Sequence, residues 1–182
     1  IELSELIGVE SPDLRIRATT LSDPESLALQ IRAYLEVRFD EQVQWRAGYT
    51  AFNRWRAAIE GVGIPVFQIY GVAVEEIRGC SLNEGRFPVI VVNGKDSPNA
   101  RIFSMLHELA HILLRQGGIC DFSEESQLGP QEPEVFCNNV AGATLVPKDY
   151  LLEENIVSRN KNHAQWDTED IEALAQKYGA SQ

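Results

Sequence analysis

The sequence has little of several features that mark common protein classes. Its three cysteines are an odd number without the spacing of a disulfide framework. Its apolar runs fall short of the roughly 18–20 residues that a membrane-spanning helix needs. Lysine and arginine number 16 against 27 acidic residues, and the net charge of −11 argues against direct nucleic-acid binding. We therefore expect a cytoplasmic protein without a signal peptide that binds neither membranes nor nucleic acids.

The hydrophobic pattern predicts an α+β fold. A chain of 182 residues can bury one sizeable core, so we expect a single domain over 1–182. Within it we distinguish an N-terminal helical extension (1–41), a catalytic core (42–147) and a C-terminal helical element (148–182). Short β-branched or aromatic runs predict a small three-stranded sheet. The strands are expected at 65–70, 75–82 and 87–93, and helices at about 24–35, 42–60, 98–115, 134–146 and 167–178.

Histidine is also scarce, and two of the three histidines stand in the pattern His107-Glu108-Leu109-Ala110-His111. Side chains four residues apart lie on one face of a helix, so both imidazoles can bind one metal ion. Glu108 is then placed beside the metal, where it can take a proton from a water molecule. This H-E-x-x-H spacing is typical of zinc metalloproteases and predicts one zinc ion, or another divalent metal, per chain.

The segment around this motif has clear helix signals. Ser97 and Pro98 are typical of an N-cap and a first helical residue, and no helix breaker follows until Gly117-Gly118. The segment is apolar almost all round, which predicts a buried helix. Its two histidines and its glutamate would be costly in such a place without a ligand.

A catalytic zinc site needs a third protein ligand and one open position. The remaining histidine, His163, is one candidate, and the downstream carboxylates are the others. We favour Glu134, because Pro133 can begin a second helix whose first turn contains it. Glu134 follows His111 by 23 residues, enough chain to bring this helix beside the first. Asn138 lies four residues further on the same face, where it can support the second ring nitrogen of a ligating histidine.

The strand before the motif helix is a candidate for substrate binding. If the segment 77–82 forms a sheet edge, it can pair with an extended peptide, although it can equally be an ordinary paired strand. At such an edge Arg78 or a nearby backbone N–H can hold the peptide. Tyr150 and His163 are both capable of stabilising the oxyanion, and the sequence does not decide between them.

Several motifs in order resemble the ImmA/IrrE family of zinc metallopeptidases. The resemblance covers about 55–147 and rests on the runs IEGVGIPVFQIY, EIRGCSL, FPVIVVNG, RIFSMLHELAHILL and EPEVFCNNVAGATLVP. It implies a zincin-like core in which the sheet packs on the motif helix. It also implies that His107, His111 and Glu134 bind the metal, that Glu108 is catalytic, and that Asn138 is the asparagine following the third ligand.

The chain departs from the usual pattern of that family at two places. Val140-Ala141-Gly142 stands where the family often has Phe-Ala-Ala, and Ser104 stands where it often has threonine. Neither position is a predicted ligand, so these departures concern packing.

The resemblance also implies a class of partner. Such proteases cleave helix-turn-helix repressors of the Xre type and switch on a stress or mobile-element response. Because the chain begins at Ile1 without methionine, we expect either the C-terminal part of a fusion to such a DNA-binding domain or a stand-alone regulatory protease. The tail LAQKYGAS resembles the first helix and turn of a helix-turn-helix and is interpreted as a docking or truncated element.

Two other interpretations stay open. The fold can instead serve as a non-catalytic, metal- or ligand-binding module that controls an attached domain, and a structural zinc would have a fourth protein ligand such as Cys137. The cysteines are expected to be buried free thiols. Cys120 and Cys137 flank the Glu134 segment, so a reversible oxidation that links them and disturbs the metal site is a further hypothesis.

Overall fold

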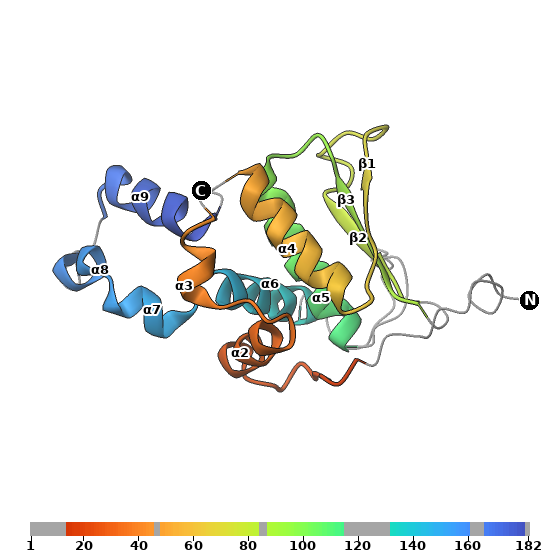
Figure 1. The fold of residues 1–182 in the computed structure, drawn as a ribbon, viewed down its shortest axis with the longest axis horizontal. Helices are drawn as coiled ribbons and strands as arrows, with labels where there is room; N and C mark the ends of the chain where they lie inside the picture. The colour runs from red at the N-terminus through yellow and green to blue at the C-terminus, as the bar shows by residue number, and fades with distance from the viewer. Residues whose placement is uncertain (1–13, 46–47, 84–86, 115–131, 161–165, 181–182) are drawn as a thin grey trace, which may run out of the picture.

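Helix α5, Pro98–Leu114, is the element on which the sheet and two other helices pack (Figure 1). The computed structural model describes residues 14–45, 48–83, 87–114, 132–160 and 166–180. As predicted, Ser97 caps α5: its hydroxyl oxygen accepts a hydrogen bond from the backbone N–H of Ala100 at 3.2 Å. Most of its side chains are buried, because the sheet, helix α4 (Tyr49–Gly61) and helix α6 (Glu132–Leu145) all contact it. This helix therefore holds its polar residues inside the protein.

The sheet has three strands, as the sequence predicts. They are β1 (Val66–Ile69), β2 (Gly79–Leu82) and β3 (Val89–Asn93), in the order β1-β3-β2. Strand β1 runs parallel to β3, and β2 runs antiparallel to it with Ser81 opposite Ile90. One face of the sheet packs on α5, which confirms the predicted α+β arrangement.

The second strand is shorter than predicted. It begins at Gly79 instead of residue 75, because the preceding residues form a turn in which the N–H groups of Glu76 and Ile77 donate to the carbonyl of Ala73. The candidate edge strand is therefore limited to Gly79–Leu82. Within the described residues, β3 is its only partner, so β2 does lie at an edge of the sheet.

The predicted helix over 42–60 is wrong as a continuous element. The structure has a short helix α3 (Phe39–Gln42) and a separate helix α4 (Tyr49–Gly61). Gly48 precedes α4 with φ of +97°, a conformation that takes the chain out of helical geometry and that favours glycine. The earlier helix α2 (Pro24–Tyr34) begins as predicted, with the Asp23 carboxylate accepting from the N–H of Ser26 at 2.8 Å.

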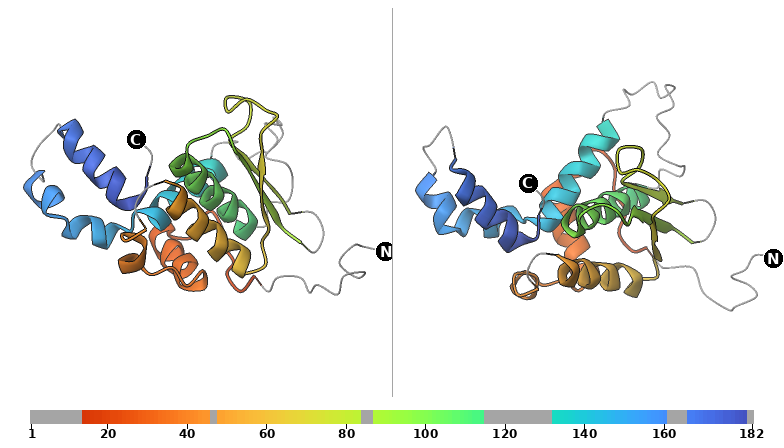
Figure 2. Two further views of the ribbon diagram at one scale, coloured as in Figure 1. Left: turned by 45° about the horizontal axis from the view of Figure 1, so that its top comes forward. Right: turned by 90° about the horizontal axis from the view of Figure 1, so that it is seen from above.

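Helix α6, Glu132–Leu145, packs against both α5 and α2. It begins one residue before the proline that was expected to open it, and Pro133 is tolerated there because the first turn needs no N–H donor. Three further helices follow, α7 (Lys148–Glu153), α8 (Asn155–Asn160) and α9 (Thr168–Tyr178). Both views in Figure 2 place them on the side of the molecule away from the sheet. Gly179 ends α9 with φ of +70°, as predicted.

A buried amide connects this C-terminal part to the core. The Gln42 side chain donates to the carbonyls of Leu145 and Tyr178, both at 2.9 Å, and accepts from the Arg32 guanidinium at 2.6 Å. Burial lowers the pKa of Arg32 to about 10, so this guanidinium is still charged at neutral pH. Gln42 thus joins the ends of α6 and α9 to a buried cation. Among the described residues, no helix is long and apolar enough to cross a membrane.

Replacing Gln42 with alanine should lower the free energy of unfolding by about 2–4 kcal/mol, because two buried carbonyls and a buried guanidinium lose a partner. Chemical denaturation of the variant beside wild type measures this difference. Gln44→Ala is the matched control, since Gln44 is exposed two residues away. Equal changes in the free energy of unfolding for the two substitutions would show that the buried hydrogen bonds of Gln42 do not stabilise the fold.

Candidate metal centre

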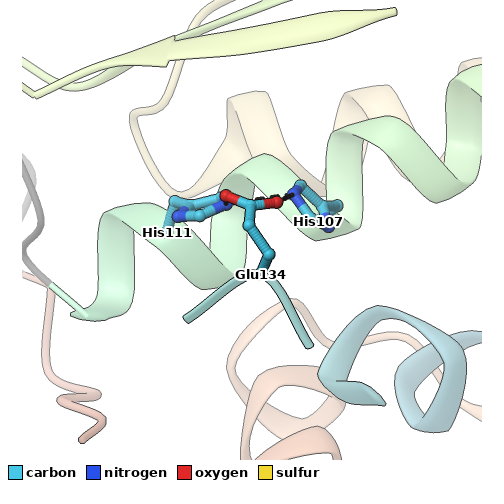
Figure 3. A group of neighbouring side chains, drawn as sticks. All are labelled: His107, His111 and Glu134. Atoms are coloured by element: carbon cyan, nitrogen blue, oxygen red, sulfur yellow. Dashed lines mark hydrogen bonds and ion pairs between the residues drawn. The ribbon is translucent and has the colours of Figure 1, made fainter. Parts of the chain in front are cut away.

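Helices α5 and α6 bring three predicted site residues together (Figure 3). His107 and His111 lie on one face of α5, one turn apart, and Glu134 reaches them from the first turn of α6. The two Nε2 atoms are 3.0 Å apart. The Glu134 carboxylate places Oε2 3.2 Å from Nε2 of His107 and Oε1 3.1 Å from Nε2 of His111. One donor atom from each residue therefore points into the same small volume.

The His111 side chain is buried, the His107 side chain is mostly buried, and the Glu134 carboxylate is half exposed. The side chains of His107, His111 and Glu134 are 14%, 5% and 47% exposed. Burial lowers the pKa of both histidines, and this effect outweighs the nearby negative charge of Glu134, which raises it. Both rings are therefore neutral at pH 7, and the neutral ring is the form that binds metal ions.

The donor set fits a zinc-type cation. Ligand atoms at about 2.0–2.1 Å from a tetrahedral ion lie about 3.3 Å from one another. The two Nε2 atoms are 3.0 Å apart, and each has a different oxygen of Glu134 at 3.1–3.2 Å, so small side-chain adjustments suffice to surround an ion. A proton on one Nε2 can be shared with only one or two of the other acceptors, whereas a divalent cation accepts a lone pair from all three. Nitrogen and carboxylate donors together are typical of zinc and related divalent metals.

Asn138 lies on the same face of α6 as Glu134. A hydrogen bond with its side chain raises the pKa of His107, as expected of a neighbour that supports this ring. Nδ1 of His107 itself is buried, and no partner stands at full hydrogen-bonding geometry to it. The supporting hydrogen bond that was expected from Asn138 to the second ring nitrogen of a ligating histidine therefore stays a prediction.

Glu108 faces the sheet from the same helix. It is 4% exposed, and its Oε2 accepts a hydrogen bond from the Ser81 hydroxyl on β2 at 2.8 Å. Burial and, to a lesser degree, the charge of Glu134 raise its pKa to about 7, while the Ser81 hydrogen bond lowers it. A carboxylate with such a pKa can take and release protons at neutral pH, as a general base must.

Ser81 was not among the predicted site residues. The alternation of side chains along a strand could have placed it, because Ser81 is buried while Cys80 and Leu82, its neighbours in sequence, are not. The sequence alone does not show that this face of the strand packs against Glu108.

The remaining predicted residues are not part of this group. Arg78 lies just before β2 and is paired with Asp96, with Nη1 3.7 Å from Oδ2. The Tyr150 ring, on α7, is stacked on Phe39 with ring centroids 4.0 Å apart. The oxyanion role predicted for Tyr150 has no support in this contact, and His163 lies outside the described residues.

The cysteine hypotheses stay largely untested. Cys137 is buried on α6, and neither it nor Cys80 forms a disulfide among the residues that the structure describes. The candidate group there contains His107, His111 and Glu134, without Cys137 as a fourth donor. Cys120 lies outside the described residues, so the proposed link to Cys137 stays a prediction.

Comparison with known protein families shows to which family the chain belongs. The model of the peptidase M78 family, described as the IrrE N-terminal-like domain, matches residues 60–182, which is more than half of the sequence. The chain belongs to the peptidase M78 family. The resemblance to ImmA/IrrE metallopeptidases is thereby confirmed. The search of curated proteins returned no match. The part of this M78 chain that matches includes the whole sheet, α5 and α6, and therefore every residue of the candidate metal centre.

The raised pKa of Glu108 has a consequence for the stability of the metal-free M78 domain. An acid whose pKa rises from 4.5 to about 7 on folding holds its proton more tightly in the folded state. The contribution of Glu108 to the free energy of unfolding therefore falls as pH rises from about 4.5 to 7, by about 3 kcal/mol. Glu108→Gln should remove this loss. In the presence of a chelator, the variant should be the more stable protein at pH 8 and lose that advantage at pH 4.5.

Thermal or chemical unfolding at several pH values measures this difference. Glu132→Gln is the control for the loss of one exposed carboxylate on α6. A stability difference between wild type and Glu108→Gln that is constant over this pH range would contradict the burial of an ionisable Glu108.

Proposed function

We propose that this M78 domain is a zinc-dependent endopeptidase. His107, His111 and Glu134 hold the zinc ion, and Glu108 is the general base. The observation that carries the proposal is the convergence within 4.8 Å of two neutral imidazoles of α5 and a carboxylate of α6, beside a buried glutamate of α5 with a pKa of about 7. Membership of a peptidase family supports it.

The division of work among the residues follows from their positions. Zinc, when bound, polarises the carbonyl of a peptide and makes water more acidic. Three protein ligands leave a position open for water or substrate, as in catalytic and unlike structural zinc sites. Glu108 takes the proton from the attacking water and then gives it to the leaving amine, which requires a pKa near neutral.

Strand β2 provides a place for an extended substrate. Its edge away from β3 bears no other described strand, and Ser81 connects this strand directly to Glu108. A peptide that pairs with β2 through backbone hydrogen bonds would lie alongside α5. The outward side chains of Cys80 and Leu82 would then contact the substrate residues. This arrangement favours an unfolded or flexible segment of a protein as the substrate.

The substrate that we propose is a helix-turn-helix repressor of the Xre type, whose cleavage switches on a stress or mobile-element response. The family resemblance supports this choice, and so does the charge of the chain. A net charge of −11 favours encounter with a basic protein, and DNA-binding domains carry the clustered lysine and arginine that bind phosphate. The domain itself acts on the protein partner and not on DNA.

The decisive test compares wild type with Glu108→Gln. Both proteins should contain one zinc per chain by elemental analysis, because the substitution leaves the three ligands in place. Cleavage of a repressor encoded beside the gene should fall by about 10²- to 10⁴-fold, which is the usual contribution of general acid–base catalysis. Equal cleavage by both proteins would refute the enzymatic proposal. A regulatory output that survives in Glu108→Gln would instead identify a non-catalytic module.

Glu134→Ala should lower zinc affinity by more than about 100-fold, since residues that merely orient ligands already contribute 10- to 100-fold. Competition with a chromogenic chelator measures the affinity. Glu132→Ala is the matched control, because Glu132 is exposed in the same first turn of α6. If both variants retain zinc equally, Glu134 is not a ligand.

A further inference from the structure

The contact between Ser81 and Glu108 joins the edge strand to the general base. Ser81 is 3% exposed, and its hydroxyl is 2.8 Å from Oε2 of Glu108. The strand lies close to the helix at this place: a Cβ atom on Gly79 would be 3.5 Å from Cγ of Glu108 and 3.4 Å from Cβ of Ser104. The position of the hydroxyl is therefore set by the packing of β2 on α5.

This hydrogen bond restricts the orientation of the carboxylate. A serine hydroxyl has a single proton to donate, and here it is given to Oε2. Because Ser81 stands opposite Ile90 in the β2–β3 register, the backbone of the sheet fixes the Cα from which this short side chain reaches Glu108. Oε1 is not engaged by the Ser81 hydroxyl, and this oxygen can take a proton from water.

A purely structural role explains the residue poorly. A buried strand position that faces a helix is usually filled by a β-branched or aliphatic side chain, which stabilises the sheet by packing. A buried hydroxyl adds little unless it has a partner. At this position the partner is the ionisable group on which the proposed reaction depends.

We propose that Ser81 is a positioning residue that holds Glu108 in its reactive orientation from the strand that binds the substrate. This inference rests on the proposed peptidase function. It means that a peptide paired with β2 restrains the strand, the strand restrains Ser81, and Ser81 restrains the base. Substrate binding and alignment of the base are thereby coupled through the contact between Ser81 and Glu108.

The kinetic test uses three variants of the zinc-loaded protein with the repressor as substrate. Ser81→Ala should lower kcat by about 10- to 100-fold while KM and zinc content stay unchanged. Ser81→Thr keeps the hydroxyl and should restore most of kcat. Ser104→Ala, which removes a different buried hydroxyl from the same contact of helix and strand, should behave like wild type. Wild-type kcat in Ser81→Ala, or no recovery in Ser81→Thr, would overturn the inference.

A second measurement needs no activity. In the metal-free protein, the shifts in unfolding midpoint caused by Ser81→Ala and Glu108→Ala should be clearly non-additive in the double variant, because each removes the same hydrogen bond. Additive shifts would overturn the contact on which the inference rests. If Glu108→Gln abolishes cleavage and Ser81→Ala does not, the inference fails and the peptidase stands. If wild type cleaves nothing, the peptidase proposal fails, and the metal-free cycle still tests the contact.

Discussion

The packing of α6 against α5 is the interaction on which the candidate site depends. Two donor atoms come from α5 and one from α6, so the group exists only while these helices stay in register. Apolar residues on both helices, among them Leu109 and Val140, are fully buried and supply the hydrophobic free energy that holds them together. The same burial removes water from the imidazoles and keeps them neutral. The burial that holds the two helices together therefore also keeps the histidine side chains in the form that binds metal ions.

Much of this site could be predicted from the sequence, because its signals are local. The spacing of His107 and His111 requires only a helix, and the proline before Glu134 marks where the second helix begins. The structure also shows the surroundings of the departures from the family pattern. A Cβ on Gly142 would meet no atom within 4 Å, so the position makes no packing demand, and Val140 is fully buried. Ser104 is likewise accommodated beside Gly79.

What the sequence could not supply depends on contacts between distant segments. Helix α3 ends at Gln42, and Gly48, with φ of +97°, precedes α4 in a stretch whose side chains otherwise favour helix. The Gly48 N–H is in turn held by the Asn99 amide of α5, which also donates to the carbonyl of Ala180 after α9. The contacts of Ser81 and Tyr150 could not be predicted for the same reason. Their partners, Glu108 and Phe39, are set by tertiary packing and cannot be read from local pattern.

Because the donor atoms belong to two helices separated in sequence, metal affinity and helix packing are linked thermodynamically. An ion that binds only the assembled group stabilises the α5–α6 contact by RT ln(1 + [M]/Kd). A ligand or partner that binds better when α6 has shifted weakens metal binding by the same factor by which the metal weakens the binding of that partner. Such a shift of α6 would move Glu134, the most exposed of the three donors, relative to the two histidines. The first turn of α6 is therefore a point at which an event on the surface of the protein can set the occupancy of its centre.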